Sequence, residues 1–336
     1  MPVDMIPATP VSRSRRLLRG LGWNVLVIAI TLLVAELVLQ WFNPVYLRMH
    51  DWNGVGYQHD LELGWSPIAN LATVLSLPRT TTVKNNSLGL RDIEPERDSR
   101  PAILFLGDSF VWGYNVEDSE RFTDLLRSEL PGYRIVNAGV TGYGTDQEYL
   151  LMKRLWDLVN PDVVVLMFCV ENDRADNSNN VRYFSYKPYL RMTADGDWQF
   201  AGQPVPKERR VRFKESSLAR TSMLARLAIS AYVELRYWRI TVPDPTERLI
   251  GLMREFVEAR GRKFAVGVQR QEPQLEAFLQ RQGIPQASFE GAELYDSSRH
   301  WTPDGHKLVA RRLMTLFAET GILTIAKPQS QSELNP

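Results

Sequence analysis

The sequence predicts an α/β fold, a three-layer α/β/α sandwich on a parallel sheet, preceded by one N-terminal transmembrane helix. Two observations support this. From residue 101 onward, short apolar runs alternate with amphipathic segments, a pattern typical of βαβ units with a sheet covered on both faces. Residues 21–42 form an apolar stretch long enough to span a bilayer. A chain of 336 residues also has room for about two domains, at roughly 150 residues per domain.

The apolar stretch predicts a transmembrane signal anchor. Its polar residues are Asn24, Thr31, Glu36 and Gln40. Four arginines precede it, and the next cation is Arg48, so the positive-inside rule places residues 1–20 in the cytoplasm and the rest outside. A cleaved signal peptide is the alternative, but its apolar region is usually only about 7–15 residues long. An uncleaved anchor is therefore favoured.

Glu36 is the one acidic residue of the apolar stretch, where an ionised carboxylate is costly. One interpretation is that it serves a function or binds a partner helix in the membrane. The favoured interpretation is that it snorkels or stays protonated, since it lies roughly 9 Å of helix rise from Phe42.

The remaining elements follow in chain order. Residues 43–100 are rich in turn formers and predict a collar with short strands. Strands are predicted at 103–106, 135–137, 163–168 and 264–268. Helices are predicted at 119–130, 146–158, 246–260, 273–281 and 304–320, before a polar tail at 327–336. An insertion at 178–244 contains a hairpin at 189–200, with Asp195-Gly196 at its turn, and two amphipathic helices within 217–238.

Composition excludes several classes of function. Forty Lys and Arg residues against thirty-nine Asp and Glu give a net charge of +1, so the chain lacks the broad cationic face of a nucleic-acid-binding protein. The single cysteine, Cys169, excludes an internal disulfide framework and a CxxC zinc site. Four histidines leave little for a metal centre. We therefore expect no nucleic-acid partner, no metal and no cofactor.

Polar clusters follow the predicted strands, at the sheet edge where open α/β folds bind ligands. Ser109 ends the first strand, a glycine-rich turn at 137–145 follows the second, and Asn172 follows the third. His300 lies in a polar stretch before the last helix. A serine hydroxyl becomes a good nucleophile only with a base and preorganised oxyanion donors. Gly-Asp-Ser alone is weak evidence, and the glycine turn lacks the GxGxxG pattern of a phosphate-binding loop.

The four clusters, in this order, resemble the blocks of the SGNH or GDSL hydrolases, over a domain spanning residues 101–326. The resemblance implies a flavodoxin-like sheet, Ser109 as nucleophile and His300 as the base that deprotonates it. It also implies an oxyanion hole made by the backbone N–H groups of Ser109 and Gly142 and the side-chain amide of Asn172. Gly139 fits the glycine block less well.

The acid of the catalytic triad departs from the family's pattern. In the family it commonly lies two or three residues before the histidine, whereas Asp296 precedes His300 by four and Asp304 follows it by four. We select Asp296, because Asp304 follows Pro303 at the expected N-cap of the last helix. His306 and Cys169 are expected to be packing residues.

The resemblance implies a membrane-anchored bacterial ester hydrolase or O-acyltransferase in the inner membrane, with its catalytic domain in the periplasm. Its substrate would be an acylated envelope glycan or exopolysaccharide, with acetyl as the expected acyl group. Aromatic residues of the insertion are expected either to stack on sugar rings or to pack the insertion on the core. These are Tyr183, Phe184, Tyr186, Tyr189, Trp198 and Phe200. Two alternatives are a non-catalytic scaffold that binds a membrane-protein partner through Glu36 and its helix, and a phospholipid esterase.

Overall fold

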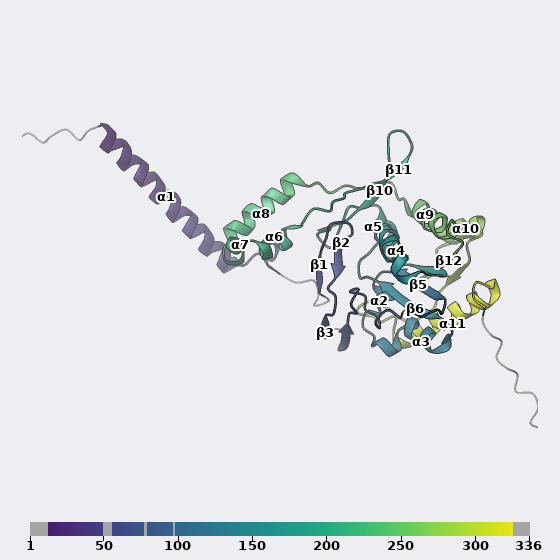
Figure 1. Ribbon diagram of the computed structural model, residues 1–336. Helices are drawn as coiled ribbons and strands as arrows, with labels where there is room; N and C mark the ends of the chain where they lie inside the picture. The colour runs from purple at the N-terminus through teal and green to yellow at the C-terminus, as the bar shows by residue number, and fades with distance from the viewer. Residues whose placement is uncertain (1–12, 50–55, 77–78, 97, 325–336) are drawn as a thin grey trace, which may run out of the picture. The chain divides into compact units, whose positions relative to one another are not determined.

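A computed structural model describes residues 13–49, 56–76, 79–96 and 98–324 (Figure 1). The chain divides into two compact units, Met1–His50 with Glu208–Trp238, and Asp51–Lys207 with Arg239–Pro336. The predicted cytoplasmic residues 1–12, the predicted polar tail and His50 lie outside the described residues.

The larger unit is built on a five-stranded sheet in which every pair of neighbours is parallel, in the order β13-β12-β7-β5-β6. The strands are β5 (Ala102–Gly107), β6 (Arg134–Gly139), β7 (Val163–Phe168), β12 (Lys263–Val268) and β13 (Gln286–Ser288). The predicted parallel sheet is confirmed. Strand β13 escaped prediction because it has three residues, none of them fully buried.

Helices cover both faces of this sheet, because alternate strand residues point to opposite sides. Leu104 and Val164 face α4 (Thr145–Val159), α9 (Thr246–Glu258) and α10 (Pro273–Gln282) in one buried cluster. Ile103 and Val165 face α3 (Phe122–Glu129) and α11 (Pro303–Thr320) in the other. These two clusters are the two interfaces of the predicted three-layer sandwich.

Residues 51–100, predicted as part of a separate collar, belong to the compact unit of the sheet. They form two antiparallel hairpins, β1 (Tyr57–Asp60) with β2 (Gly64–Pro67) and β3 (Ala72–Leu75) with β4 (Thr81–Lys84). Leu63, Trp65 and Leu90 are buried in the sheet's core. Because these apolar side chains complete that core, the segment is part of the domain and not a spacer.

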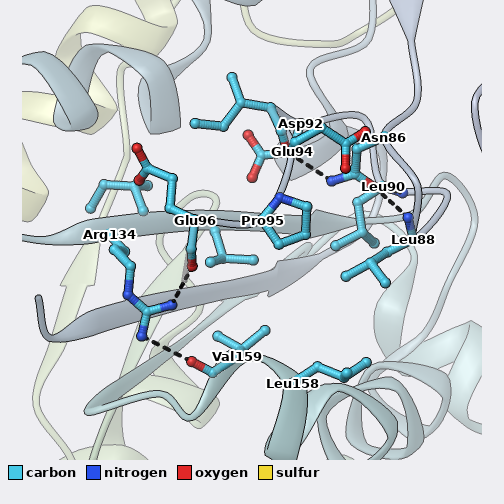
Figure 2. Close-up of a pocket in the computed structure, with 13 residues that line it drawn as sticks. Asn86, Leu88, Leu90, Asp92, Glu94, Pro95, Glu96, Arg134, Leu158 and Val159 are labelled. Atoms are coloured by element: carbon cyan, nitrogen blue, oxygen red, sulfur yellow. Dashed lines mark hydrogen bonds between the residues drawn. The ribbon is translucent and has the colours of Figure 1, made fainter. Parts of the chain in front are cut away.

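The segment that follows the hairpins runs beside edge strand β6 (Figure 2). Arg134 of β6 donates to the carbonyls of Glu96 at 3.0 Å and Val159 at 3.1 Å. Asn86 donates to the carbonyl of Ile93 at 2.8 Å. The small pocket between these residues is lined mainly by apolar groups and does not include Ser109 or His300.

The predicted insertion at 178–244 is divided between the two units. Residues 178–207 stay with the sheet and form the short pair β8 (Val181–Arg182) and β9 (Ser185–Tyr186), then the expected hairpin β10 (Tyr189–Met192) and β11 (Trp198–Ala201). Residues Glu208–Trp238, here called the helical module, belong to the unit of the N-terminal helix. The module contains α6 (Arg209–Glu215), α7 (Ser217–Thr221) and α8 (Met223–Arg236).

The N-terminal helix α1 runs from Arg13 to Phe42. Its part Leu17–Phe42 is long and apolar enough to cross a membrane, with a mean hydropathy of 2.4 over its most apolar 18 residues. The Glu36 carboxylate accepts hydrogen bonds from Ser222 Oγ and from the backbone N–H groups of Met223 and Leu224, at 2.8–2.9 Å. Glu36 therefore has a helix partner, and that helix is α8 of the same chain.

Candidate active site

Ser109 lies at the point where β5 turns into the short helix α2 (Ser109–Trp112). The turn is tight: a Cβ on Gly107 would lie 2.3 Å from Val111 Cγ2, so only glycine fits the end of the strand. Asp108 caps α2 by accepting a hydrogen bond from the Phe110 N–H at 2.9 Å, as expected for a residue that satisfies local backbone donors. This geometry places the serine hydroxyl at the carboxyl edge of the sheet.

His300 lies on a loop held by Trp301, a fully buried residue. The Trp301 ring packs edge-to-face against Phe110 and Phe289, with centroids 4.8 and 5.8 Å apart. The loop closes on itself, since the Tyr295 N–H donates to the His300 carbonyl at 2.8 Å. Arg299, just before the histidine, has a φ of 61°, a left-handed conformation that favours glycine. The backbone is therefore fixed on both sides of His300.

The loop brings His300 to Ser109. His300 Nε2 lies 2.7 Å from Ser109 Oγ, and Nδ1 lies 2.8 Å from the carbonyl oxygen of Ser298. A carbonyl oxygen only accepts hydrogen bonds, so Nδ1 carries the proton. Nε2 is then the unprotonated nitrogen, which accepts a hydrogen bond from the Ser109 hydroxyl. Burial lowers the pKa of His300 to about 4, so the imidazole is neutral and basic at physiological pH.

The structure does not place either candidate acid beside the imidazole. Asp296 is exposed, and its carboxylate lies beyond ion-pair distance of His300, whose Nδ1 faces the Ser298 carbonyl instead. Asp304 is exposed and pairs with Lys307 at 2.8 Å. The N-cap of α11 is Thr302, not Asp304, because the Thr302 hydroxyl accepts from the Gly305 N–H at 3.1 Å. The arrangement is a serine–histidine dyad oriented by a main-chain carbonyl.

Gly142 lies on the glycine turn after β6 with a φ of 77°, a value that side chains rarely adopt. The β1–β2 hairpin holds this turn: Tyr57 Oη is 2.6 Å from Thr141 Oγ1, and Trp65 Nε1 donates to the Thr141 carbonyl at 3.3 Å. Within the described residues, the N–H groups of Ser109 and Gly142 have no hydrogen-bond acceptor. Both remain available to an oxyanion. Sequence reasoning missed the hairpin's part in the site because its residues carry no catalytic group.

Asn172 lies at the start of α5 (Asp173–Asn177), and its side-chain amide is already hydrogen-bonded within the protein. Its Nδ2 donates to carboxylate oxygens of Asp176 at 2.8 Å and Asp173 at 3.2 Å, and its Oδ1 accepts from Cys169 Sγ at 2.8 Å. The role of third oxyanion donor therefore requires the side chain to rotate away from these partners.

A group of buried carboxyls lies behind the dyad. Its members come from three parts of the chain: Asp108, Asp146, Glu148, Asp173 and Asp176. Burial raises the pKa of Asp108 to about 6 and the pKa values of Glu148 and Asp173 well above their ordinary value. Lys187, also buried, pairs with Asp146. Within the described chain both carboxyl oxygens of Glu148 lack a hydrogen-bond partner.

Of the described residues, Asp108, Cys169 and Asp173 bring potential metal-ligand atoms within 4.8 Å of one another. The two carboxylates already accept hydrogen bonds from the protein, since Asp173 accepts from the Cys169 N–H at 2.7 Å and Asp108 caps α2. Burial raises the pKa of the Cys169 thiol well above its ordinary value, so it is a packing residue and not a second nucleophile. His306 is likewise structural: it is buried and accepts from the Phe122 N–H at 3.3 Å.

Tyr183 lies against Gly142. A Cβ added to that glycine would be 2.6 Å from Tyr183 Cε2. Tyr183 and Phe184 form the turn between β8 and β9 with φ values of 49° and 70°, a strained conformation for aromatic residues. Arg182 fixes the tyrosine, since its guanidinium lies 4.2 Å from the centre of the ring and donates to the phenol oxygen at 3.0 Å.

Comparisons with solved structures return proteins of the family that the four sequence blocks resemble. One is a lipolytic protein of the G-D-S-L family from Veillonella parvula, 13% identical, with 65% of this chain and 98% of that one covered and a TM-score of 0.36. Another is the esterase EstA from Pseudoalteromonas sp., 10% identical, with 65% and 97% covered and a TM-score of 0.35.

An acetyl xylan esterase is also similar, at 12% identity, with 64% of this chain and 98% of that one covered and a TM-score of 0.37. No family model and no curated protein matches the chain. At these identities and TM-scores, the function has to be inferred from the chain's own site.

Proposed function

We propose that the chain is a serine esterase or acyltransferase that removes or transfers an acyl group, acetyl in the first instance, through an acyl-enzyme on Ser109. The observation that supports this best is the hydrogen-bonded dyad, with Ser109 Oγ 2.7 Å from an imidazole nitrogen that the Ser298 carbonyl keeps unprotonated. A serine without a second function would not require a buried, neutral histidine held on a fixed loop beside it.

In the acylation step, the Ser109 hydroxyl passes its proton to His300 Nε2 while Oγ attacks the ester carbonyl carbon. Negative charge develops on the carbonyl oxygen, and the N–H groups of Ser109 and Gly142 are the donors available to it. The imidazolium then gives its proton to the leaving alcohol oxygen as the ester C–O bond breaks. The acyl group remains on Ser109.

In the second step, His300 removes a proton from the acceptor, whose oxygen attacks the acyl carbon. The imidazolium then returns this proton to Ser109 Oγ as the bond between the acyl carbon and Oγ breaks. Water as acceptor gives hydrolysis, and a sugar hydroxyl gives transfer. The two reactions share the dyad and differ only in the molecule that reaches the acyl-enzyme. No step requires a metal or an organic cofactor.

The proposed substrate is an acylated glycan of the cell envelope. Among the aromatic residues considered for sugar stacking, Tyr186 and Tyr189 are buried, and Phe200 stacks on Tyr149, so these three pack the insertion on the core. Tyr183 and Phe184 remain about half exposed, and Tyr183 lies beside the oxyanion glycine. They are the candidates for contacting a sugar ring. Helix α1 would anchor the enzyme to the bacterial inner membrane, with the arginines at its N-terminal end in the cytoplasm and the site in the periplasm.

The proposal is tested with a fluorophosphonate probe on the full chain in detergent. We expect labelling of Ser109, identified by mass spectrometry of the tryptic peptide, and its loss in Ser109→Ala and His300→Gln. Asp304→Asn, on an exposed acid outside the site, is the matched control and should label normally. A folded protein that fails to label would refute the esterase and favour a non-catalytic scaffold.

A further inference from the structure

The helical module contains an apolar surface that its own fold leaves uncovered. Leu227, Ala231 and Leu235 recur at four-residue intervals on α8 and are exposed, with Leu227 at 44% and Leu235 at 79%. Four-residue spacing places them on one side of the helix. Trp238, just beyond the end of α8, is 73% exposed.

The opposite side of α8 is fully engaged within the same unit. Arg226, Ser230 and Val233 are buried there. The Arg226 guanidinium donates to the carbonyls of Ala219 at 2.6 Å and Leu47 at 3.2 Å. The packed face of the helix is therefore already covered within its own unit, and the Leu227–Leu235 stripe is a second, separate surface.

Glu36 fixes where α8 begins along α1. The carboxylate accepts from two N–H groups of the first turn of α8 and from Ser222 Oγ, the N-cap residue. An anionic group at a helix N-terminus is stabilising, because the first N–H groups have no intrahelical acceptors. Glu36 precedes Phe42, the last residue of α1, by about 9 Å of helix rise. The start of α8 is therefore level with the outer part of the apolar helix.

Beyond this junction α8 diverges from α1 (Figure 1). If α1 crosses the bilayer, a helix that starts level with its outer end and turns away from it runs along the membrane surface. The module also contains seven arginine and lysine residues against three glutamates. Of these cations, Lys214, Arg220 and Arg236 are exposed. A basic segment with one exposed apolar stripe is characteristic of elements at a membrane surface, because exposed cations meet anionic lipid headgroups.

From these contacts we infer that the helical module is a membrane-interface element, with α8 lying in the outer lipid surface through Leu227, Ala231 and Leu235. The occupant of the stripe is lipid, because α1 continues into the same apolar environment and Glu36 joins the two helices. The inference rests on the proposed membrane anchoring by α1. It adds a second, in-plane attachment, which would restrict rotation of the module about the anchor.

The test places single cysteines in the full chain, labels them with an environment-sensitive fluorophore and reconstitutes the protein in phosphatidylcholine–phosphatidylglycerol vesicles. Labels at 227, 231 and 235 report the stripe. Arg236→Cys, exposed on the side of the helix opposite Leu227, is the matched control, and Val34→Cys reports the apolar part of α1. The native Cys169 is 1% exposed, so the unsubstituted protein measures background labelling. Nitroxide-bearing lipids and aqueous iodide serve as the two quenchers.

We expect nitroxide lipid to quench the labels at 227, 231 and 235 at least threefold more than the label at 236, with iodide showing the reverse order. Quenching at 34 but iodide access at the stripe would overturn the inference and leave the anchor intact. Stripe labels protected from both quenchers would mean that protein covers the surface, a second copy or a membrane partner, and would also overturn it. Absence of lipid quenching at 34 would instead refute the anchoring itself.

Discussion

Replacing Asp296 with asparagine separates the dyad seen in the structure from a Ser-His-Asp triad. In a working triad, loss of the orienting carboxylate lowers kcat by roughly 10⁴-fold, about 5.5 kcal/mol. Here the Nδ1 proton is held by the Ser298 carbonyl at 2.8 Å, and Asp296 is exposed. We therefore expect Asp296→Asn to retain kcat/KM within about threefold, or 0.6 kcal/mol. His300→Gln should lose at least a thousandfold.

The pH dependence provides an independent measurement on the same protein. The base form of His300 is required, and burial lowers its pKa to about 4. Activity should therefore be constant from pH 8 to about pH 5 and fall as the pH drops through 4, since the acid limb of kcat/KM reports the base in the free enzyme. The assay is steady-state hydrolysis of a p-nitrophenyl ester. A loss of a hundredfold or more in Asp296→Asn, together with a shifted acid limb, would refute the dyad and restore the predicted triad.

Three further predictions concern the groups around the dyad. Gly142→Ala should lower kcat by roughly a hundredfold or more, the loss typical of one oxyanion donor, because the added Cβ would clash with Tyr183 and displace the turn. The control is Gly196→Ala, at a φ of 87° with open space around it, which measures backbone strain alone and should leave kcat unchanged. Tyr183→Ala should raise KM for an acetylated oligosaccharide at least fivefold and leave hydrolysis of p-nitrophenyl acetate within twofold; equal effects on both substrates would exclude a sugar contact. Glu148→Gln should raise the Tm at pH 8 by a few degrees and change it little at pH 5, measured by calorimetry.

The sign of the Glu148 prediction follows from its raised pKa. A carboxyl whose pKa is higher in the folded protein contributes stability that is complete below the unfolded pKa and is lost as pH rises through the folded one. At pH 8 the wild-type protein must either bury a charge or hold a proton against solvent, whereas glutamine has neither cost. One kcal/mol shifts Tm by roughly 2–4 °C in a domain of this size. A Tm that is lower in the variant at both pH values would mean that Glu148 has a bonded role.

Most of the sheet domain is predictable from sequence because the apolar residues of its strands and helices recur with regular spacing. Strand β7 coincides with the predicted 163–168, and α10 and α11 match their predictions within one residue. The elements that escaped prediction are short, such as α2, α5 and β13, and too short to show a period. The β8–β9 turn also escaped prediction, because its two central residues are aromatic but adopt the positive φ values that are usual for Asn-Gly.

The site shows a different limit of sequence reasoning. Ser109 and His300 were identified because their side chains carry the chemistry, and the structure brings them together. The partner of Nδ1 could not be predicted, because it is a main-chain carbonyl. Every residue has one, so the sequence does not distinguish Ser298. Searching for a carboxylate selected Asp296 by elimination, although a neutral acceptor is sufficient to fix the tautomer.

Glu36 was ambiguous for a related reason. Its position in an apolar stretch showed that it needed a partner, but the N–H groups that satisfy it belong to Met223 and Leu224, which are apolar residues by name. Backbone donors at a helix N-terminus exist only once the helix has formed. The cost of a carboxylate in an apolar segment can therefore be offset when the same chain supplies the N-terminus of a helix. The partner of such an acid has to be sought among helix N-caps such as Ser222 as well as among basic side chains.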